Sequence, residues 1–170
     1  MIKNKLQNIK RCFLTMNKTI STAESCTGGY LGKVLTDLPG SSKFFKGGII
    51  AYSNEIKEKI LKVSPRTLKK YGAVSPQTVK EMAKGVIQLY NTDYAISITG
   101  IAGPSGGSKN KPVGLVYICL VKNSPSLKFY IFKSKFIGNR NNIRKKTILK
   151  VLEILENTLL VEYKNGKFNC

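Results

Sequence analysis

The sequence predicts an α/β protein, folded as a three-layer α/β/α sandwich around a mixed β-sheet. Two observations lead to this fold class. Segments with helical and with strand-like patterns alternate through the first half of the chain, which is typical of parallel strands joined by helices. Two strand-like segments then follow one another before a last long helix, and such strands pair as an antiparallel hairpin. The 170 residues show no internal repeat or boundary, so we expect one domain over 1–170.

The first element is an amphipathic helix with lysines on its outer face. Its apolar residues recur at spacings of four, three and four: Ile2, Leu6, Ile9 and Phe13. A β-like run at 18–21 follows, and we expect its strand to end near Ser25. The next expected elements are a helix over 30–38, a strand over 47–53 and a helix over 54–63.

The second half begins with helices that open on a serine followed by a proline. Ser64-Pro65 and Ser75-Pro76 each place a capping side chain before a proline suited to the first helical position. The helix after Ser75 has one apolar face, formed by Val79, Met82, Ala83, Val86, Ile87 and Tyr90. The remaining elements are a strand over 94–99, a loop over 100–114, strands over 115–121 and 128–136, and a helix over 141–160. The tail from about 163 is polar, and we expect it to be loose.

The charge of the chain does not by itself indicate a nucleic-acid partner. The net charge is +20, but 25 of the 29 basic residues are lysines, scattered along the whole chain. Lysine, asparagine and isoleucine are abundant together, which indicates compositional drift rather than a selected basic patch. No pattern of RNA-stacking aromatics is recognisable. We therefore expect no specific nucleic-acid partner, and only weak, salt-sensitive binding.

Cysteine and histidine usage narrows the possible chemistry. The four cysteines, at positions 12, 26, 119 and 170, form no CxxC pair, and the sequence has no histidine. We expect no metal site of the zinc type and no Ser-His-Asp or Cys-His catalysis, so a hydrolase would need another base. No run approaches the roughly 20 apolar residues of a membrane span, and no signal-peptide pattern is present. We therefore expect a cytoplasmic protein with no membrane partner.

The segment Thr22-Ala23-Glu24-Ser25-Cys26-Thr27-Gly28-Gly29 is the strongest candidate for a reactive site. A hydroxyl side chain at a strand-to-helix turn can be exposed as a nucleophile, and we assign that role to Ser25. The N–H groups of the turn that follows, at Cys26, Thr27 and Gly28, can face a developing negative charge. The alternative is that Ser25 or Thr27 only caps the next helix.

Lys57 is the candidate base. With Ser53 or Asn54 as the N-cap, Lys57 falls in the first helical turn, where the helix dipole disfavours a positive charge. Its pKa should therefore fall, more so if it is buried, and a neutral lysine can deprotonate a serine. Tyr52 could relay a proton or orient the pair. The alternative is that Lys57 is one of many solvated lysines.

The Gly- and Ser-rich loop after residue 99 is a candidate for substrate binding. Its backbone can approach a ligand closely, and from it we select Thr99, Gly100 and Gly103. A mobile surface loop is an equally good interpretation of this composition. If the strands before Ser25, Tyr52 and this loop are parallel, the three segments meet at one edge of the sheet.

Arg140 and Arg144 are the candidates for holding a phosphate. They are two of only four arginines, and they lie four residues apart at the start of the last helix, hence on one face. Arginine binds phosphate with two parallel hydrogen bonds, and a helix N-terminus favours the same anion. The alternative is a pair of solvated surface arginines.

Several motifs occur together in one order: T-A-E-S-C-T-G-G (22–29), T-D-L-P-G-S-S (36–42), G-G-I-I-A-Y-S-N-E-I-K (47–57), G-A-V-S (72–75), T-G-I-A-G-P-S-G-G (99–107), K-P-V-G (111–114) and G-N-R-N-N-I-R (138–144). Over about 18–160 the chain resembles the CinA C-terminal domain family, whose stand-alone PncC-type members are nicotinamide-nucleotide amidases. The resemblance implies deamidation of nicotinamide mononucleotide to nicotinic acid mononucleotide and ammonia, with no metal or redox cofactor. It also implies that the family's serine, tyrosine and lysine fall on Ser25, Tyr52 and Lys57, and it suggests a homodimer.

Larger relatives carry an N-terminal pyrophosphatase-like domain, and we do not expect its activity here. Gly138-Asn139-Arg140 stands where the family usually has Gly-Asp-Arg, so a charge beside the arginine is lost. The competing interpretation of the chain is a nucleotide-binding module without catalysis, and within the enzyme interpretation Cys26 is a rival nucleophile to Ser25.

Overall fold

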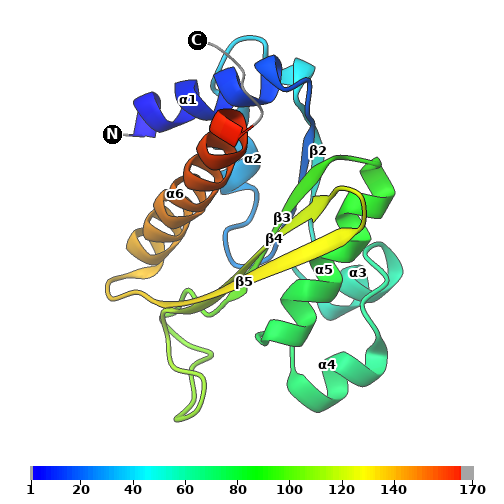
Figure 1. Ribbon diagram of the computed structural model, residues 1–170. Helices are drawn as coiled ribbons and strands as arrows, with labels where there is room; N and C mark the ends of the chain where they lie inside the picture. Colours follow the sequence, from blue (N-terminus) through cyan, green and yellow to red (C-terminus); the bar gives the residue numbers. More distant parts are fainter. Residues whose placement is uncertain (1, 166–170) are drawn as a thin grey trace.

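Five strands form a mixed sheet, which confirms the predicted fold class. The computed structural model describes residues 2–165. Its strands are β1 (Ile20–Glu24), β2 (Phe45–Ile50), β3 (Tyr94–Gly100), β4 (Leu115–Asn123) and β5 (Leu127–Lys135). Their spatial order is β2-β1-β3-β4-β5 (Figure 1). β1 pairs in parallel with β2 and β3, whereas β3 with β4 and β4 with β5 are antiparallel. The three parallel strands therefore end at one edge of the sheet.

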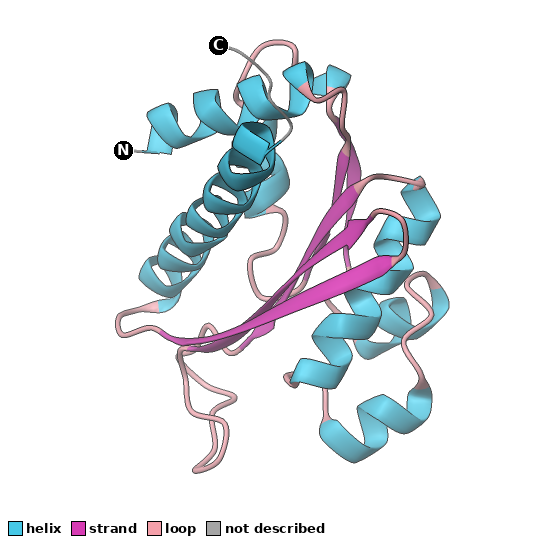
Figure 2. Cartoon of the chain, viewed as in Figure 1, coloured by secondary structure: helices cyan, strands magenta, loops and turns pink. Residues whose placement is uncertain are grey.

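Helices cover both faces of this sheet (Figure 2). One layer contains α1 (Ile2–Thr15), α2 (Tyr30–Thr36) and α6 (Arg140–Asn165), and the other contains α3 (Asn54–Lys59), α4 (Pro65–Tyr71) and α5 (Pro76–Tyr90). Side chains alternate along a strand, so β3 supplies both layers: Ile96 and Ile98 pack with α1 and α6, and Ala95 packs with α5. Within residues 2–165, none of the helices is both long and apolar enough to cross a bilayer.

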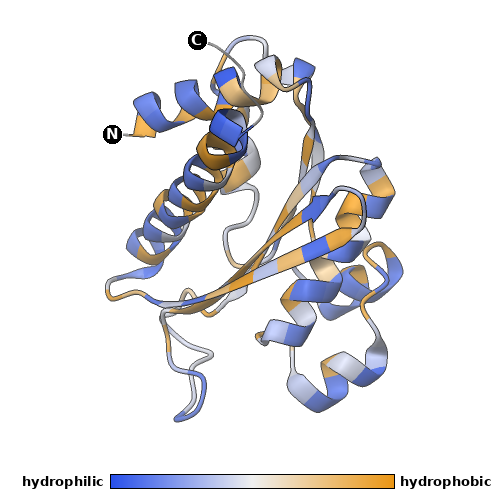
Figure 3. Cartoon of the chain, viewed as in Figure 1, coloured by the Kyte–Doolittle hydropathy of each residue, from blue (hydrophilic) through white to orange (hydrophobic). Residues whose placement is uncertain are grey.

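The last helix is longer than the sequence indicated. Its apolar positions form the inner face toward α1 and the sheet (Figure 3), but α6 continues to Asn165 instead of ending near residue 160. The expectation of a loose tail from about 163 is wrong for 163–165, because Tyr163 is a buried part of the core; residues 166–170 lie outside the described part. Glu162 holds this end of the helix on the sheet, since it pairs with Lys122 at 2.7 Å and accepts a hydrogen bond from the hydroxyl of Tyr94.

Two boundaries near the reactive edge also differ from the expected ones. β2 begins at Phe45, which pairs with Ile20 of β1, and it ends at Ile50 instead of running over 47–53. The helix expected over 54–63 ends at Lys59. The chain after it packs against α5 so closely that a Cβ on Gly85 would lie 2.0 Å from Leu61 O. Tertiary packing therefore sets the end of α3.

Candidate active site

The carboxyl ends of β1, β2 and β3 bring the candidate reactive residues to one edge of the sheet. Glu24, the last residue of β1, is in register with Ile50 of β2 and Ile98 of β3. Backbone pairing continues one step beyond the strands. Ala51 N donates to Glu24 O at 2.8 Å, and Ser25 N donates to Ile98 O at 3.0 Å. Ser25 is therefore fixed where β1 leaves the sheet.

The side chains of Ser25 and Lys57 meet at this edge. Ser53 caps α3 with its side chain, as expected, and Lys57 lies in the turn that follows. Lys57 Nζ is 3.2 Å from Ser25 Oγ. It also lies 2.7 Å from Ala51 O and 3.3 Å from Tyr52 O. The amine thus has the candidate nucleophile and two backbone carbonyls as its neighbours.

Lys57 is not one of the solvated lysines. Its exposed fraction is only 1%, whereas Lys59, two residues later, is exposed and pairs with Glu55. Burial lowers the pKa of Lys57 below its ordinary value of 10.5, and a negative charge at Cys26 would oppose this shift. The same direction was expected from the helix dipole and, if the side chain was buried, from burial; in the structure the main cause is desolvation.

Cys26 occupies a different environment from Ser25. Its side chain packs in the apolar cluster between the sheet and the α1–α2–α6 layer. Burial raises the pKa of the Cys26 thiol to about 12, and the charge of Glu24 acts in the same direction. Because the thiolate is the nucleophilic form of cysteine, this shift favours Ser25 over Cys26.

The carboxylate of Glu24 organises the turn that carries Ser25. It is 2% exposed and accepts the N–H groups of Gly29, Leu31 and Gly32 at 3.1, 3.0 and 2.8 Å. These N–H groups lie at the start of α2, and N–H groups in the first turn of a helix have no acceptor within the helix. The helix start is therefore occupied by an acceptor from the chain itself, and its charge holds the strand and the helix at a fixed distance.

The turn still contains polar atoms without a partner. Gly28 N donates to Ser25 O at 3.0 Å, so this N–H is already engaged. The N–H of Cys26 interacts with its own thiol, and the N–H of Thr27 has no backbone acceptor among residues 2–165. Thr27 Oγ1 is buried and also lacks a partner in this part of the chain. Buried polar atoms are nearly always paired, so unpaired ones beside Ser25 are consistent with a ligand site.

Tyr52 and Arg140 form a second contact at the mouth of the site. The Tyr52 side chain is 59% exposed, and its hydroxyl accepts a hydrogen bond from Arg140 Nη2 at 2.7 Å. Arg140 Nη1 donates to Gly103 O at 2.8 Å. Tyr52 is hydrogen-bonded to Lys57 through its backbone oxygen. The Tyr52 hydroxyl is hydrogen-bonded to Arg140, and it does not lie between Lys57 and Ser25.

A pocket of about 270 Å³ joins these groups. It is lined by Ser25, Lys57, Tyr52 and Arg140, and also by the candidate loop residues Thr99, Gly100 and Gly103. The Thr99 hydroxyl donates to Ala73 O at 2.7 Å, so it supports the neighbouring loop. A Cβ on Gly100 would lie 2.7 Å from Leu115 O, which explains why glycine stands there. We call this space the reaction pocket.

The reaction pocket also contains residues that the sequence argument did not select. Ala73 and Val74 line it from the segment between α4 and α5. The only signal for them was the G-A-V-S motif (72–75), which has no chemically reactive side chain to draw attention.

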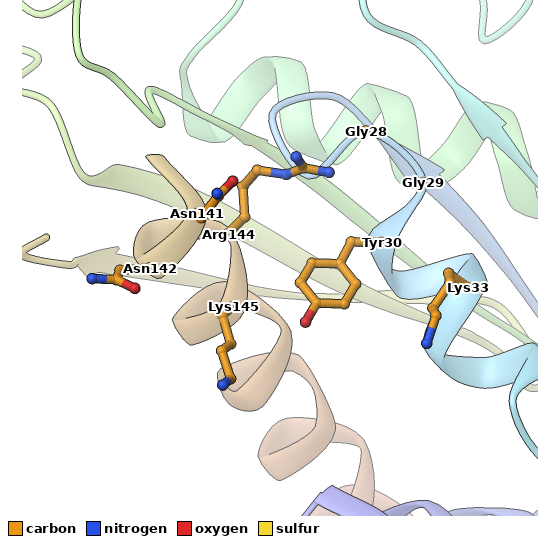
Figure 4. A pocket seen from close by; sticks show the side chains of 8 residues that line it. All are labelled: Gly28, Gly29, Tyr30, Lys33, Asn141, Asn142, Arg144 and Lys145. Atoms are coloured by element: carbon orange, nitrogen blue, oxygen red, sulfur yellow. The ribbon is translucent and has the colours of Figure 1, made fainter. Parts of the chain in front are cut away.

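Arg144 does not reach the reaction pocket. Its Nε and Nη2 donate to Thr27 O at 3.1 and 2.6 Å, on the other side of the turn. It lines a second pocket of about 490 Å³ with Tyr30, Lys33 and Lys145 (Figure 4). The two arginines share a helix face, as predicted, but the turn at 25–29 divides them between two pockets. Tyr30, Lys33 and Lys145 were not singled out from the sequence.

Asn139 serves as a helix cap at the position where the family usually has aspartate. Its Oδ1 accepts the N–H of Asn142 at 2.9 Å, and its backbone oxygen accepts the N–H of Ile143 at 2.9 Å. Asparagine is as good an N-cap as aspartate. The substitution therefore preserves the start of α6, from which Arg140 extends.

The described residues offer no arrangement for a metal ion. Across 2–165, no group of three or more His, Cys, Asp or Glu side chains is placed to hold one. The polar side chains of the reaction pocket supply an amine, a guanidinium, a thiol and four hydroxyls, and backbone atoms line it as well. This set can bind a polar substrate and move a proton.

Comparison with known proteins gives consistent matches. The model of the CinA C-terminal domain matches residues 3–159. A CinA-like protein of Endomicrobium trichonymphae is 50% identical over 153 residues, which are 90% of this chain and 35% of that protein. Another CinA-like protein, from Syntrophomonas wolfei subsp. wolfei, is 47% identical over 161 residues, covering 95% of this chain and 37% of that one. The chain thus spans about a third of the length of these curated relatives.

Solved structures with the same fold extend the comparison. The competence/damage inducible protein CihA from Agrobacterium tumefaciens superposes with a TM-score of 0.88 at 36% identity, over 93% of this chain and 94% of that one. The competence damage-inducible protein A from Klebsiella pneumoniae gives 0.89 at 29% identity, over 94% and 97%.

Proposed function

The chain belongs to the CinA C-terminal domain family, and on that premise we propose that it is an amidohydrolase. Its proposed substrate is nicotinamide mononucleotide, which it converts to nicotinic acid mononucleotide and ammonia. Ser25 is the nucleophile and Lys57 is its base. The observation that carries this proposal is the buried amine of Lys57, 3.2 Å from Ser25 Oγ in a chain without histidine.

The neighbours of Lys57 suit a neutral amine. A neutral amine keeps two N–H groups and one lone pair, and Lys57 Nζ has two carbonyl oxygens and one hydroxyl around it. If the N–H groups donate to Ala51 O and Tyr52 O, the lone pair faces the Ser25 hydroxyl. Burial favours this neutral form because it penalises the charged one.

The first half of the reaction is acyl transfer. Ser25 Oγ attacks the carboxamide carbon, and its proton passes to Lys57 Nζ. The carbonyl oxygen becomes an oxyanion, for which the N–H groups of Cys26 and Thr27 are the available donors. Lys57 then gives the proton to the departing nitrogen, so ammonia leaves and an ester on Ser25 remains.

The second half is hydrolysis of that ester. Water attacks the acyl carbon while Lys57 takes its proton. Collapse of the intermediate breaks the bond to Ser25 Oγ, which recovers the proton from Lys57. The products are the nucleotide with a free carboxyl group and the enzyme in its starting state.

Arg140 is the proposed anchor for the substrate phosphate. It is the arginine that lines the reaction pocket, and its guanidinium is held in place by Tyr52 and Gly103. Tyr52 therefore orients this arginine in our proposal, instead of relaying a proton. Thr99, Gly100 and Gly103 form the wall along which the nucleotide lies.

Ammonia release from nicotinamide mononucleotide tests the proposal. We expect release by the purified protein and by Cys26→Ala, and loss in Ser25→Ala. Activity retained in Ser25→Ala but lost in Cys26→Ala would reverse the choice of nucleophile. A protein that binds the nucleotide without releasing ammonia would be a binding module, and the amidase proposal would fail.

A further inference from the structure

We propose that the pocket around Arg144 is a second ligand site, which binds a nucleoside monophosphate independently of the reaction pocket. It lies between the starts of α2 and α6, and it is lined by Gly28 and Gly29 of the turn that follows Ser25 (Figure 4). It measures about 490 Å³, within the range of about 300–1,000 Å³ that small-molecule sites usually occupy.

The lining of this pocket favours an anion. Three cationic side chains, those of Lys33, Arg144 and Lys145, reach it, and no acidic side chain lines it. Lys33 also forms an exposed ion pair with Asp37, in which Nζ lies 2.7 Å from Oδ2. The pocket also lies at the first turn of the 26-residue helix α6, where the helix dipole favours negative charge.

Arg144 is oriented before any ligand arrives. Its Nε and Nη2 are fixed on Thr27 O, and Thr27 belongs to the rigid turn held by Glu24. A guanidinium carries five N–H donors, so Arg144, which lines the pocket, keeps donors that Thr27 O does not use. An arginine that is already ordered loses less side-chain entropy on binding than a solvated lysine does.

Tyr30 supplies a surface for a flat ring. Its ring projects from the start of α2 toward α6, with Arg144 on one side and the amino ends of Lys33 and Lys145 flanking it (Figure 4). The Arg144 guanidinium carbon lies over one face of this ring, 5.9 Å from the ring centre, so a base would stack on the other face. Aromatic side chains bind nucleobases by stacking, worth about 1–3 kcal/mol per base. A phosphate beside the cations and a base on Tyr30 together identify a nucleoside monophosphate as the ligand class.

Equilibrium dialysis with adenosine monophosphate tests this site. The chain has a net charge of +20, so the test needs a control for general attraction of anions. The variant Lys33→Gln/Lys145→Gln removes two charges from the pocket. The matched variant Lys69→Gln/Lys84→Gln removes two exposed charges from α4 and α5, away from both pockets. Adenosine and inorganic phosphate serve as partial ligands, and Arg140→Ala removes the cation of the reaction pocket.

We expect the dissociation constant for adenosine monophosphate to rise about tenfold or more in Lys33→Gln/Lys145→Gln. It should change less than about twofold in the matched variant and in Arg140→Ala, and adenosine and phosphate should each bind more weakly than the nucleotide. Equal weakening in both double variants would show general charge attraction and overturn the proposal. Loss of binding in Arg140→Ala alone would place the nucleotide in the reaction pocket and would also overturn it. None of these readouts requires amidase activity, so they are independent of the proposed function.

Discussion

The two pockets on either side of the Ser25 turn use lysine in opposite ways. In the reaction pocket Lys57 is buried, and its pKa is lowered mainly by desolvation. In the second pocket Lys33 is exposed, and its pKa is raised by the carboxylate of Asp37. One environment makes a lysine able to accept a proton, and the other keeps a lysine charged.

This difference shows that lysine content says little about what a lysine does in this protein. The chain has 25 lysines, and in the sequence only its place in the first turn of a helix distinguished Lys57 from the others. Burial separates Lys57 from the others, because removing a charge from water is costly unless the group becomes neutral. The turn held by Glu24 separates the two environments, and it contributes residues to both pockets.

Removing the buried amine should have the largest effect. We expect Lys57→Met to lower kcat by about 10³-fold, since general base catalysis typically contributes 10²–10⁴-fold. The free energy of unfolding should not fall, because methionine fills a similar volume without a group to desolvate. Lys59→Met is the control from the exposed face of α3, and its kcat should stay unchanged. A fully active Lys57→Met enzyme would remove Lys57 from the mechanism.

The pH profile should report the same buried amine. Below the pKa of folded Lys57, kcat/KM should rise about tenfold per pH unit, because only the neutral amine is active. It should level off before pH 10.5, the ordinary value. Profiles measured from pH 6 to 11 on the wild type would check this, and a rate still climbing above 10.5 would contradict it.

The lowered pKa of Lys57 should make the stability of the folded protein depend on pH. Between the lowered pKa and 10.5, the unfolded chain holds a proton on Lys57 that the folded chain does not. The free energy of unfolding of the wild type, measured against Lys57→Met, should therefore rise with pH across this window and be constant below it.

Weakening the turn that separates the two pockets should lower the free energy of unfolding, which is a smaller effect than the loss of kcat in Lys57→Met. Glu24→Gln replaces one carboxylate oxygen by an amide nitrogen, which cannot accept the N–H groups at the start of α2. We expect a loss of about 1–3 kcal/mol in the free energy of unfolding, the usual cost of a buried unpaired donor. Urea denaturation would measure it. Glu55→Gln, on the exposed face of α3, is the matched control and should leave stability nearly unchanged.

Replacing the exposed Arg140 should have the smallest effect, and the effect should be on KM. We expect Arg140→Ala to raise the KM for nicotinamide mononucleotide about tenfold, equivalent to about 1.4 kcal/mol of binding, with little change in kcat. Kinetics with nicotinamide riboside, which lacks the phosphate, provide the control, because its KM should not respond to the variant. An equal response for both substrates would show that Arg140 does not bind the phosphate.

Much of this protein could be predicted from local sequence. Apolar spacing located the helices and strands, and the serine-proline pairs located the starts of α4 and α5. The strand-to-helix turn at Ser25 and the loops after β2 and β3 identified the reactive edge, because parallel strands bring their carboxyl ends together. These features depend on residues close together in the chain, and so they are visible without a structure.

The tertiary structure decided the rest, since it alone determines which atoms are removed from water and which distant segments meet. It places Lys57 Nζ 3.2 Å from Ser25 Oγ and buries it, so that desolvation is the main cause of its lowered pKa. It brings the Tyr52 hydroxyl into a hydrogen bond with Arg140, which lies 88 positions later in the chain. It also divided Arg140 from Arg144, because the turn between 25 and 29 packs against the helix that carries both.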